Sequence, residues 1–431
     1  IHWGELAARC SHHIGRGVIP MKGFFSKEQT QTKGQMKGFS CASCGLYKYA
    51  LSPKMQPYGN FKKRIMVIGE APGEDEDRRG KPWQGKMGRV LQRKYKELGI
   101  DLFDDCISLN AVNCRPTDKK GANRTPTDQE IACCFPKVIQ AIKKYQPKVI
   151  ILQGGAPTQS LIGRKWKGDF GGIMKWRGWA IPDREYNAWI CPTFHPSFIE
   201  RQDGESEADV IWTQDLKNAF EKVDSIFPNL KNEEDAVIIT DDFEGVMAEM
   251  NMPAMMAFDI ETTGLKPYDT KKHKIITISF CNELNKAYAT PFPTKKKHLR
   301  LLKELLENPK VEKVAANMKY EDNWMNVLHG ISVYPWEFDT MLAAHIIDNR
   351  FGITGLKFQS YVRFGVLGYD DDVAPYLKAK DSNSVNRIME LAETKEGMRK
   401  LLLYNGIDSL MEYRLAVLQK LSLEGMERRY R

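Results

Sequence analysis

The sequence predicts an α/β protein with two domains, each of them a sheet covered by helices. In the first half of the chain, short apolar runs alternate with helical patterns, which is typical of a parallel sheet sandwiched by helices. The apolar runs cover residues 65–68, 149–152 and 189–193, and the helical patterns cover 88–98 and 129–145. A further apolar run at 255–260 follows a polar stretch and begins a second series. The length of 431 residues also fits two to three domains.

Changes in composition divide the chain into four segments. They are an extension at 1–38, a first domain at 39–225, a polar and acidic linker at 226–235, and a second domain at 236–431. In the extension, Cys10, His12 and His13 leave metal binding open, although the plainer interpretation is that they bind nothing. We expect the second domain to begin with a strand at 236–240.

The overall composition is that of a soluble globular chain that favours polyanions. It has 42% hydrophobic and 28% charged residues, with a net charge of +9. No apolar run approaches the ~20 residues that span a membrane, and no signal peptide opens the chain, so we expect no membrane partner. Nine cysteines in such a chain favour a reducing cytoplasm and a metal site over disulfides.

Five oxygen-bearing side chains in the second half predict a metal site. Asp259 and Glu261 lie two residues apart in a predicted strand, so both point to one face of it. Tyr404 and Asp408 lie four apart in a helical pattern and share a helix face. Together with Asp322, they offer the oxygen ligands that hard divalent cations prefer. Two such cations clamp the attacking and leaving oxygens of a phosphodiester, so we predict phosphodiester hydrolysis with Mg²⁺ or Mn²⁺.

This set of residues resembles the DEDDy class of 3′→5′ exonucleases, the proofreading domain of family A DNA polymerases. The resemblance runs from about residue 236 to the C-terminus and includes DTMLAAH at 339–345 and GLK at 355–357. It implies an RNase H-like fold that digests single-stranded 3′ ends. It also implies that Tyr404 orients the nucleophilic water, while four carboxylates bind the metals: Asp259, Glu261, Asp322 and Asp408. A lone Asp-x-Glu is usually a solvated strand end, but the ordered set is specific.

Five cysteines in the first half offer a second metal site. Cys41-Ala-Ser-Cys44 precedes Cys114 and the adjacent pair Cys133 and Cys134. A single C-x-x-C is compatible with a redox pair, a zinc half-site or an iron–sulfur half-site. Two later cysteines complete four thiolates, which is enough for zinc or a cubane cluster. The spacing alone leaves the metal open.

The motifs around these cysteines resemble the family 4 uracil-DNA glycosylases. In order, they are GEAPG at 69–73, GKPWQG at 80–85, NAVNCRP at 110–116 and HPS at 195–197. The resemblance covers roughly 39–223. It implies a [4Fe–4S] cluster held by Cys41, Cys44, Cys114 and Cys134. An insertion around 118–122, between the third and fourth cysteines, keeps Cys133 as an alternative ligand.

The same resemblance assigns roles around a uracil that has been flipped out of the DNA stack. Trp83, where the family usually has Phe, would support the base, and Asn110 would pair with its edge. His195 would donate to the uracil anion that leaves. The resemblance gives further roles to four residues. Glu70 would assist water or the sugar cation, Glu76 would block the C5 face, and Gly73 and Ser197 would hold a flanking phosphate.

Together, these features predict the DNA-processing part of a phage-type DNA polymerase, combining proofreading with uracil excision. Its partners would be single-stranded 3′ ends, uracil-containing strands and a polymerase domain C-terminal to this chain. Its compartment would be the cytoplasm, which is that of the bacterial host if a phage encodes it. The alternative is an exonuclease with a non-catalytic domain that reads modified bases or clamps DNA. A pocket filled by the Trp83 ring would favour that alternative.

Overall fold

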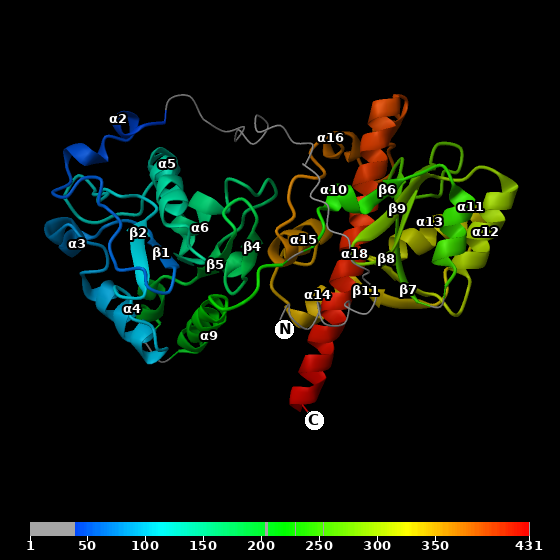
Figure 1. Ribbon diagram of the computed structural model, residues 1–431. Coiled ribbons are helices and arrows are strands. Elements are labelled where there is room, and N and C mark those ends of the chain that lie inside the picture. Colours follow the sequence, from blue (N-terminus) through cyan, green and yellow to red (C-terminus); the bar gives the residue numbers. More distant parts are fainter. Residues whose placement is uncertain (1–38, 203–205, 229, 253, 431) are drawn as a thin grey trace, which may run out of the picture. The chain divides into compact units, whose positions relative to one another are not determined.

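The computed structural model describes residues 39–202, 206–228, 230–252 and 254–430, which form two compact units (Figure 1). The first unit ends at Pro228 and the second begins at Asn229. This division falls inside the expected linker at 226–235. The expectations for residues 1–38, including Cys10, His12 and His13, lie outside the described residues.

The first unit is built on a five-stranded sheet with the order β2-β1-β3-β5-β4. Four strands are parallel, and the short edge strand β4 runs antiparallel to β5. The strands are β1 (Ile65–Gly69), β2 (Cys106–Asn110), β3 (Val149–Gln153), β4 (Ile181–Asp183) and β5 (Ala188–Thr193). The three predicted strands all form, and the predicted parallel sheet is confirmed apart from its edge.

Helices cover both faces of this sheet, as the near-continuous apolar strands require. On one face, Ile65 and Val67 pack with Leu91 of α4 (Lys86–Glu97) and Trp212 of α9 (Glu207–Glu221). The opposite face carries α5 (Asp128–Tyr145) and α6 (Gly155–Leu161) (Figure 1). Each large apolar side chain buried in this way contributes about 1.5–3 kcal/mol. The turns at the carboxyl ends of β1, β2 and β5 are left open to hold a ligand.

The second unit is built on a mixed six-stranded sheet with the order β11-β10-β7-β8-β9-β6. Its centre, β7-β8-β9, is antiparallel, while β10 joins β7 and β6 joins β9 in parallel. The strands are β6 (Val237–Ile239), β7 (Met255–Thr262), β8 (Ile275–Glu283), β9 (Lys286–Pro291), β10 (Glu312–Ala315) and β11 (Trp336–Asp339). Both units are therefore α/β, which confirms the predicted fold class.

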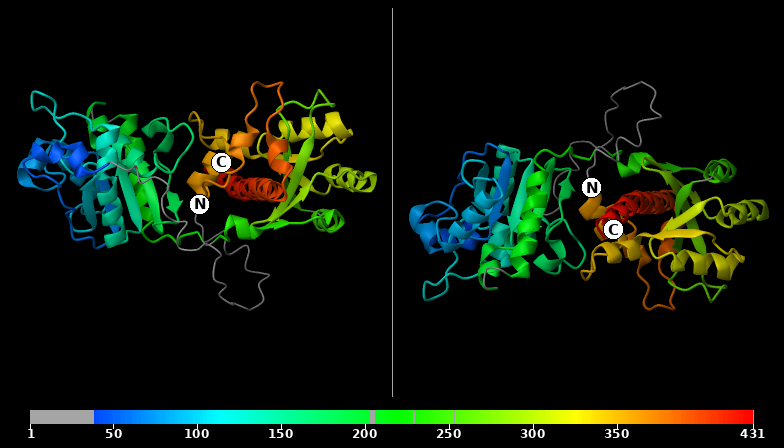
Figure 2. Two further views of the ribbon diagram at one scale, coloured as in Figure 1. Left: turned by 90° about the horizontal axis from the view of Figure 1, so that it is seen from above. Right: turned by 90° about the horizontal axis from the view of Figure 1, so that it is seen from below.

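Alternation along β7 places core side chains on one face of the strand and the candidate metal ligands on the other. Phe258 and Ile260 belong to the buried cluster that β7 and β8 share with α11 (Phe243–Met250), α12 (Lys296–Leu306) and α13 (Lys319–His329). Asp259 and Glu261 consequently point to the other face, which the long helix α18 (Lys395–Tyr430) covers (Figure 2). The predicted strand thus places both carboxylates against a helix.

The end of the expected linker is folded instead of extended. Residues Glu233–Ala236 form the short helix α10, and β6 begins only at Val237. Glu233 is buried, and its Oε1 lies 3.2 Å from Nη1 of Arg414 on α18, which neutralises its charge. This buried ion pair ties the short helix to the second unit.

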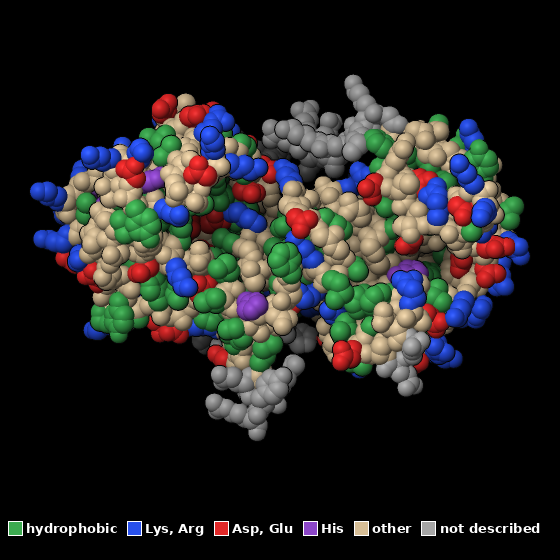
Figure 3. Space-filling model, turned by 180° about the vertical axis from the view of Figure 1, so that it is seen from behind, with side chains coloured by type: hydrophobic (Ala, Val, Ile, Leu, Met, Phe, Trp, Pro, Cys, Tyr) green, Lys and Arg blue, Asp and Glu red, His purple; other side chains and the backbone are tan. Residues whose placement is uncertain are grey.

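Charge of both signs is mixed on the face of the protein that Figure 3 draws. Figure 3 shows lysine and arginine side chains scattered across the visible face, with acidic side chains between them. The net charge of +9 therefore does not by itself mark a path for a polyanion. Within the described residues, no helix is long and apolar enough to cross a membrane.

Candidate functional site

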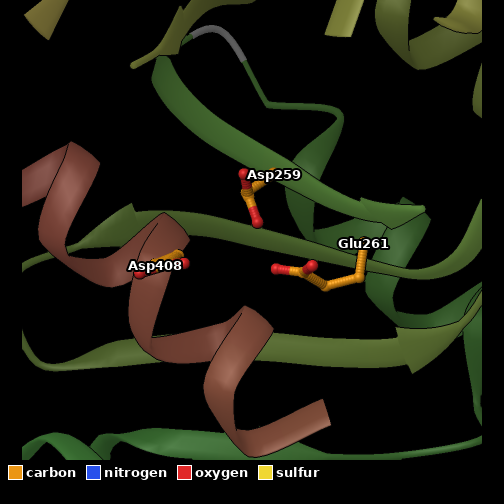
Figure 4. Close-up of side chains that lie close together, drawn as sticks. All are labelled: Asp259, Glu261 and Asp408. Atoms are coloured by element: carbon orange, nitrogen blue, oxygen red, sulfur yellow. The ribbon is translucent and has the colours of Figure 1, made fainter. Parts of the chain in front are cut away.

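Three of the predicted carboxylates meet between β7 and α18. Oxygens of Asp259, Glu261 and Asp408 all lie within 4.8 Å of one another, and the three side chains point into one space (Figure 4). Burial raises the pKa of Asp259 and of Glu261 well above their usual values, and repulsion from Asp408 adds to both shifts. Such a set is unfavourable until positive charge enters it, and its oxygen donors fit Mg²⁺ or Mn²⁺.

A lysine and two tyrosines surround Asp408. Nζ of Lys357, on α15 (Leu356–Phe364), donates to Oδ1 of Asp408, and the Tyr369 hydroxyl donates to the same oxygen over 2.6 Å. Nζ also lies 4.0 Å and 4.2 Å from the ring centroids of Tyr369 and Tyr404. The ammonium group thus fixes the Tyr404 ring beside the carboxylates. The sequence motif GLK contained Lys357, but nothing in it indicated Tyr369.

Asp322, the fourth predicted carboxylate, lies outside this group of three, as does the preceding residue, Glu321. Asp322 is partly exposed on α13, and its Oδ1 accepts a hydrogen bond from Trp336 Nε1 over 3.4 Å. The preceding residue, Glu321, is buried, and its charge raises the pKa of Glu261. Consecutive helix positions differ by about 100°, so only one of them can face the cluster. Glu321 precedes the buried Trp324 by three residues, and this apolar spacing could have identified it.

A further buried carboxylate, Glu412, lies one helical turn after Asp408. Its Oε1 accepts a hydrogen bond from the Ala316 amide over 3.0 Å. Burial raises its pKa well above the usual value, and repulsion from Asp259 and Glu321 adds to the shift. One oxygen of Glu412 and one of Glu321 have no hydrogen-bond partner within the described chain. Sequence reasoning missed Glu412, although its spacing of four from Asp408 was a usable signal.

In the first unit, one pocket of about 490 Å³ brings together every residue assigned to the flipped base. It lies at the carboxyl ends of β1, β2 and β5, where an α/β sheet usually binds its ligand. The predicted residues that line it are Glu70, Gly73, Glu76, Trp83, Asn110, His195 and Ser197. The Trp83 ring forms part of the wall and leaves the pocket open.

Gly69, at the end of β1, lets Asn110 and Trp83 converge. A Cβ atom on Gly69 would lie 2.6 Å from Asn110 Oδ1 and 2.8 Å from Trp83 Cζ2, so a larger residue would displace both. Trp83 has a φ of +58°, an unusual backbone for a bulky residue. Its buried Nε1 has no hydrogen-bond partner within the described chain. Because this nitrogen is buried, Trp83 contributes to the pocket through its ring and not through its donor.

Hydrogen bonds fix the proton on His195. Its Nδ1 accepts from the Ser197 amide over 3.1 Å and lies 2.8 Å from the Ser197 hydroxyl. Because Nδ1 is the acceptor, the neutral ring carries its proton on Nε2. Burial, assisted by the nearby Arg201 charge, lowers the pKa of His195 to about 4. His195 is therefore a neutral donor at physiological pH.

Three other assigned residues are held differently from expectation. The Glu76 carboxylate accepts hydrogen bonds from the amides of Gly73, Gln84 and Gly85 at 3.1, 2.8 and 2.7 Å. The Gly73 amide is therefore bound to Glu76, and the Ser197 amide is bound to His195. The Gly73 amide, which was expected to hold a phosphate, thus already has an acceptor, and the Ser197 hydroxyl, expected to do the same, lies 2.8 Å from Nδ1 of His195. Burial raises the pKa of Glu70, and the charge of Arg201 opposes the shift.

The predicted cluster cysteines gather beside α5. Cys41, Cys114 and Cys134 line one cavity of about 540 Å³, and Cys44 shares α2 (Cys41–Cys44) with the first of them. All cysteines of the described chain are free thiols. Burial raises the pKa of Cys134 to about 12, so this thiol needs a bound cation to ionise near neutral pH.

Backbone amides distinguish Cys134 from Cys133. The amides of Lys54 and Asn113 donate to the sulfurs of Cys114 and Cys134, the first over 3.2 Å. In contrast, the sulfur of Cys133 lies 3.6 Å from the Ser43 hydroxyl. Hydrogen bonds from amides to sulfur are the outer-shell support that thiolate ligands of metals and clusters receive. The donor set fits a cluster and favours Cys134 as its fourth ligand.

Comparison with known proteins agrees with this geometry. Residues 56–217 match the uracil DNA glycosylase superfamily, and residues 236–360 match a 3′-5′ exonuclease family of DNA polymerase A. The type-4 uracil-DNA glycosylase of Saccharolobus solfataricus is 38% identical over 162 residues, covering 36% of this chain and 71% of that protein. The corresponding protein of Pyrobaculum aerophilum is 32% identical over 166 residues, covering 38% of this chain and 81% of that protein.

A third relative spans both units. The DNA polymerase of Bacillus phage SP01 is 25% identical over 356 residues, which is 74% of this chain but only 36% of that polymerase. The chain thus spans about a third of that protein. The first unit contains the residues that match the type-4 glycosylases, and the second contains the residues that match the exonuclease. The chain therefore belongs to the uracil-DNA glycosylase superfamily, as a homologue of the type-4 enzymes, and carries in addition a 3′-5′ exonuclease domain of the DNA polymerase A type.

Proposed function

We propose that this chain carries two activities on DNA. The second unit removes nucleotides from 3′ ends by two-metal hydrolysis, and the first excises uracil. The observation that carries the proposal is an open pocket lined by all seven residues assigned to uracil, in a chain whose other unit holds a buried carboxylate cluster. The similarity to the phage SP01 polymerase supports a place beside a polymerase domain, in the host cytoplasm.

For the hydrolysis, we assign the metals to Asp259, Glu261 and Asp408, with Glu321 in place of Asp322 as the fourth carboxylate. When bound, the two cations supply Lewis-acid stabilisation and lower the pKa of the attacking water. The chain itself positions the reaction. Tyr404 orients that water by its hydroxyl, and Lys357 holds the Tyr404 ring and the Asp408 carboxylate in register.

Glu321→Gln should slow digestion of a single-stranded 3′ end far more than Asp322→Asn. The first change removes a buried charge that acts on Glu261, whereas the second removes one from a partly exposed side chain that accepts a hydrogen bond from Trp336. We expect a loss of roughly 10- to 100-fold or more for Glu321→Gln and little change for Asp322→Asn. The two adjacent variants are matched in charge loss and are compared at saturating Mg²⁺. A larger loss for Asp322→Asn than for Glu321→Gln would instead identify Asp322 as the ligand.

For the excision, the chain supplies an aromatic ring that supports the base, a carboxamide that pairs with its edge, and a hydrogen-bond donor for the anion that leaves. The base would stack on Trp83, and the Asn110 carboxamide, which makes no hydrogen bond within the described chain, can donate to one edge atom and accept from the next. This pattern matches uracil and opposes cytosine. As the C1′–N1 bond breaks, the electron pair passes to the uracil ring, and the Nε2 proton of His195 stabilises the anion. Glu70 is left to assist the water that attacks C1′.

The type-4 relatives and the four gathered cysteines support a [4Fe–4S] cluster on Cys41, Cys44, Cys114 and Cys134. Its role here would be structural, because it joins α2, the end of β2 and α5. Cys134→Ser should therefore lose most of the bound iron, and Cys133→Ser should retain it. Metal analysis and visible absorbance of anaerobically purified protein check this. Stoichiometric zinc without iron in the parent protein would refute the cluster.

The proposed excision is tested in EDTA, where the metal-dependent exonuclease is silent. The full chain is incubated with a 5′-labelled single strand that carries one internal uracil, and abasic sites are then cleaved with alkali. One band at the uracil position, absent when thymine replaces uracil, is the expected result. An uncut strand from protein that retains its iron would contradict excision and support the alternative, a domain that reads or clamps DNA without cleaving it.

A further inference from the structure

Residues 117–123, which contain the insertion between the third and fourth cluster cysteines, form a small closed hairpin. Thr117 and Asn123 pair as an antiparallel bridge, and the Asp118 amide donates to the Ala122 carbonyl over 2.9 Å. The Asp118 carboxylate accepts from the amides of Lys120 and Ala122 at 2.8 and 2.9 Å. Gly121 turns the chain with a φ of +79°, which glycine adopts without strain. The insertion is therefore an ordered turn, and its tip has a defined position.

Two arginines attach this hairpin to the rim of the uracil pocket. Arg115 donates through Nε to Asn123 Oδ1 over 2.6 Å and through Nη2 to the Gly121 carbonyl over 3.2 Å. Arg124 donates to the Thr117 carbonyl over 3.0 Å. Pro116, Asn123, Arg124 and Thr125 line the pocket. The base of the hairpin is thus part of the pocket wall, and its exposed tip, residues 118–122, projects from the rim.

The pocket itself is poorly suited to attract DNA. Four carboxylates line it, and phosphates of an approaching strand are repelled by them: Glu70, Glu74, Asp75 and Glu76. The cations that line it are already paired, Lys86 with Glu200 and Arg124 with Glu130, each pair at 2.6 Å. Arg115, which holds the hairpin, is also paired, because its Nη2 lies 3.6 Å from Oε2 of Glu74.

In contrast, the ammonium groups of Lys119 and Lys120 are exposed and have no acceptor within the described chain. Cations already neutralised within the protein contribute little to holding a polyanion. The two tip lysines are therefore free to bind DNA at this rim, together with the exposed Arg201, whose charge acts on His195 and Glu70.

We propose that Lys119 and Lys120 bind backbone phosphates of the DNA strand whose uracil enters the pocket. The inference rests on the proposed function and names the surface that positions the strand for it. Phosphate contacts of this kind fix position and carry no base specificity. Each contact to a single strand contributes about 0.7 to the slope of log affinity against log salt, so two contacts contribute about 1.4.

The test is DNA binding by the double variant Lys119→Ala/Lys120→Ala, measured by fluorescence anisotropy over a range of salt in EDTA. The probe is a labelled single strand with one 2′-fluoro-deoxyuridine, whose glycosidic bond resists excision. The matched control, Arg93→Ala/Lys96→Ala, removes the same charge near the far end of α4 from exposed positions that line neither cavity. Lys96 lies about 15 Å along the helix from Lys86, at 1.5 Å per residue.

We expect the salt slope of the hairpin variant to fall by about 1.4 and that of the control to stay at the parent value. On a cleavable substrate, the hairpin variant should show a raised KM with an unchanged kcat, because neither lysine touches the base. Equal slopes for the hairpin variant and the parent would overturn the proposal. The result is separable from the proposed function, because binding to the resistant probe is measured whether or not the parent protein excises uracil.

Discussion

Asp259→Asn should abolish 3′→5′ digestion of single-stranded DNA and leave uracil excision at the level of the parent protein. The substitution keeps the shape of the side chain but removes its charge from a cluster in which Glu261 and Asp408 lie within 4.8 Å. Metal ions contribute several kcal/mol to such transition states. A loss of about 4 kcal/mol corresponds to roughly 10³-fold in rate. Digestion of a 5′-labelled strand in Mg²⁺ measures the loss, and Asp241→Asn, at an exposed position, controls for charge.

For the same variant we expect stability to be kept or raised, although activity is lost. Burial and mutual repulsion raise the pKa of Asp259, so between its usual and its raised pKa the folded state binds more protons than the unfolded state. The ionised carboxylate therefore destabilises the metal-free protein as pH rises. In EDTA near neutral pH, Asp259→Asn should melt at the same or a higher temperature than the parent. A lower melting temperature together with lost digestion would indicate a structural residue and contradict the metal-site assignment.

Much of this site could be predicted from local sequence, because its geometry is set by local periodicity. Alternation in the run 255–262 fixed the side of β7 on which Asp259 and Glu261 lie, and Phe258 confirms it from the core side. The choice between Glu321 and Asp322 depended on the phase of one helix, and two adjacent acids made the motif ambiguous. The buried neighbours Trp324 and Met325 show which side of the helix faces the core.

Contacts between distant segments could not be predicted in this way. Lys357 reaches an aspartate 51 positions away, and neither helix has a pattern that specifies the pair. Which acceptor each backbone amide binds could not be predicted from the sequence either. The amide of Gly73 was expected to face a phosphate, but it donates to the Glu76 side chain three residues away. A sequence shows which donors exist, whereas their partners depend on how each turn closes.

His195→Ala should slow uracil release by about 10²–10³-fold, the cost of removing one preorganised donor to a developing anion. DNA affinity should change little, because the interaction strengthens only as the anion forms. Single-turnover excision in EDTA measures the rate, and anisotropy with the excision-resistant strand measures affinity. Ser197→Ala is the matched control, since it removes the hydroxyl near Nδ1 but keeps the amide that fixes the tautomer. Equal losses of rate and affinity for His195→Ala would contradict a transition-state role.

The pH profile distinguishes a neutral donor from a charged one. Burial lowers the pKa of His195 to about 4, so the ring is neutral throughout pH 5.5–8 and its contribution to the rate should be flat there. Protonation below that pKa would place a proton on Nδ1 and break the bond from the Ser197 amide that orients the ring. If an imidazolium were the acid, the rate would instead rise as pH falls through 6. The ratio of parent to His195→Ala rates across pH removes the effects of other groups, and a constant ratio identifies the neutral Nε2 proton as the donor.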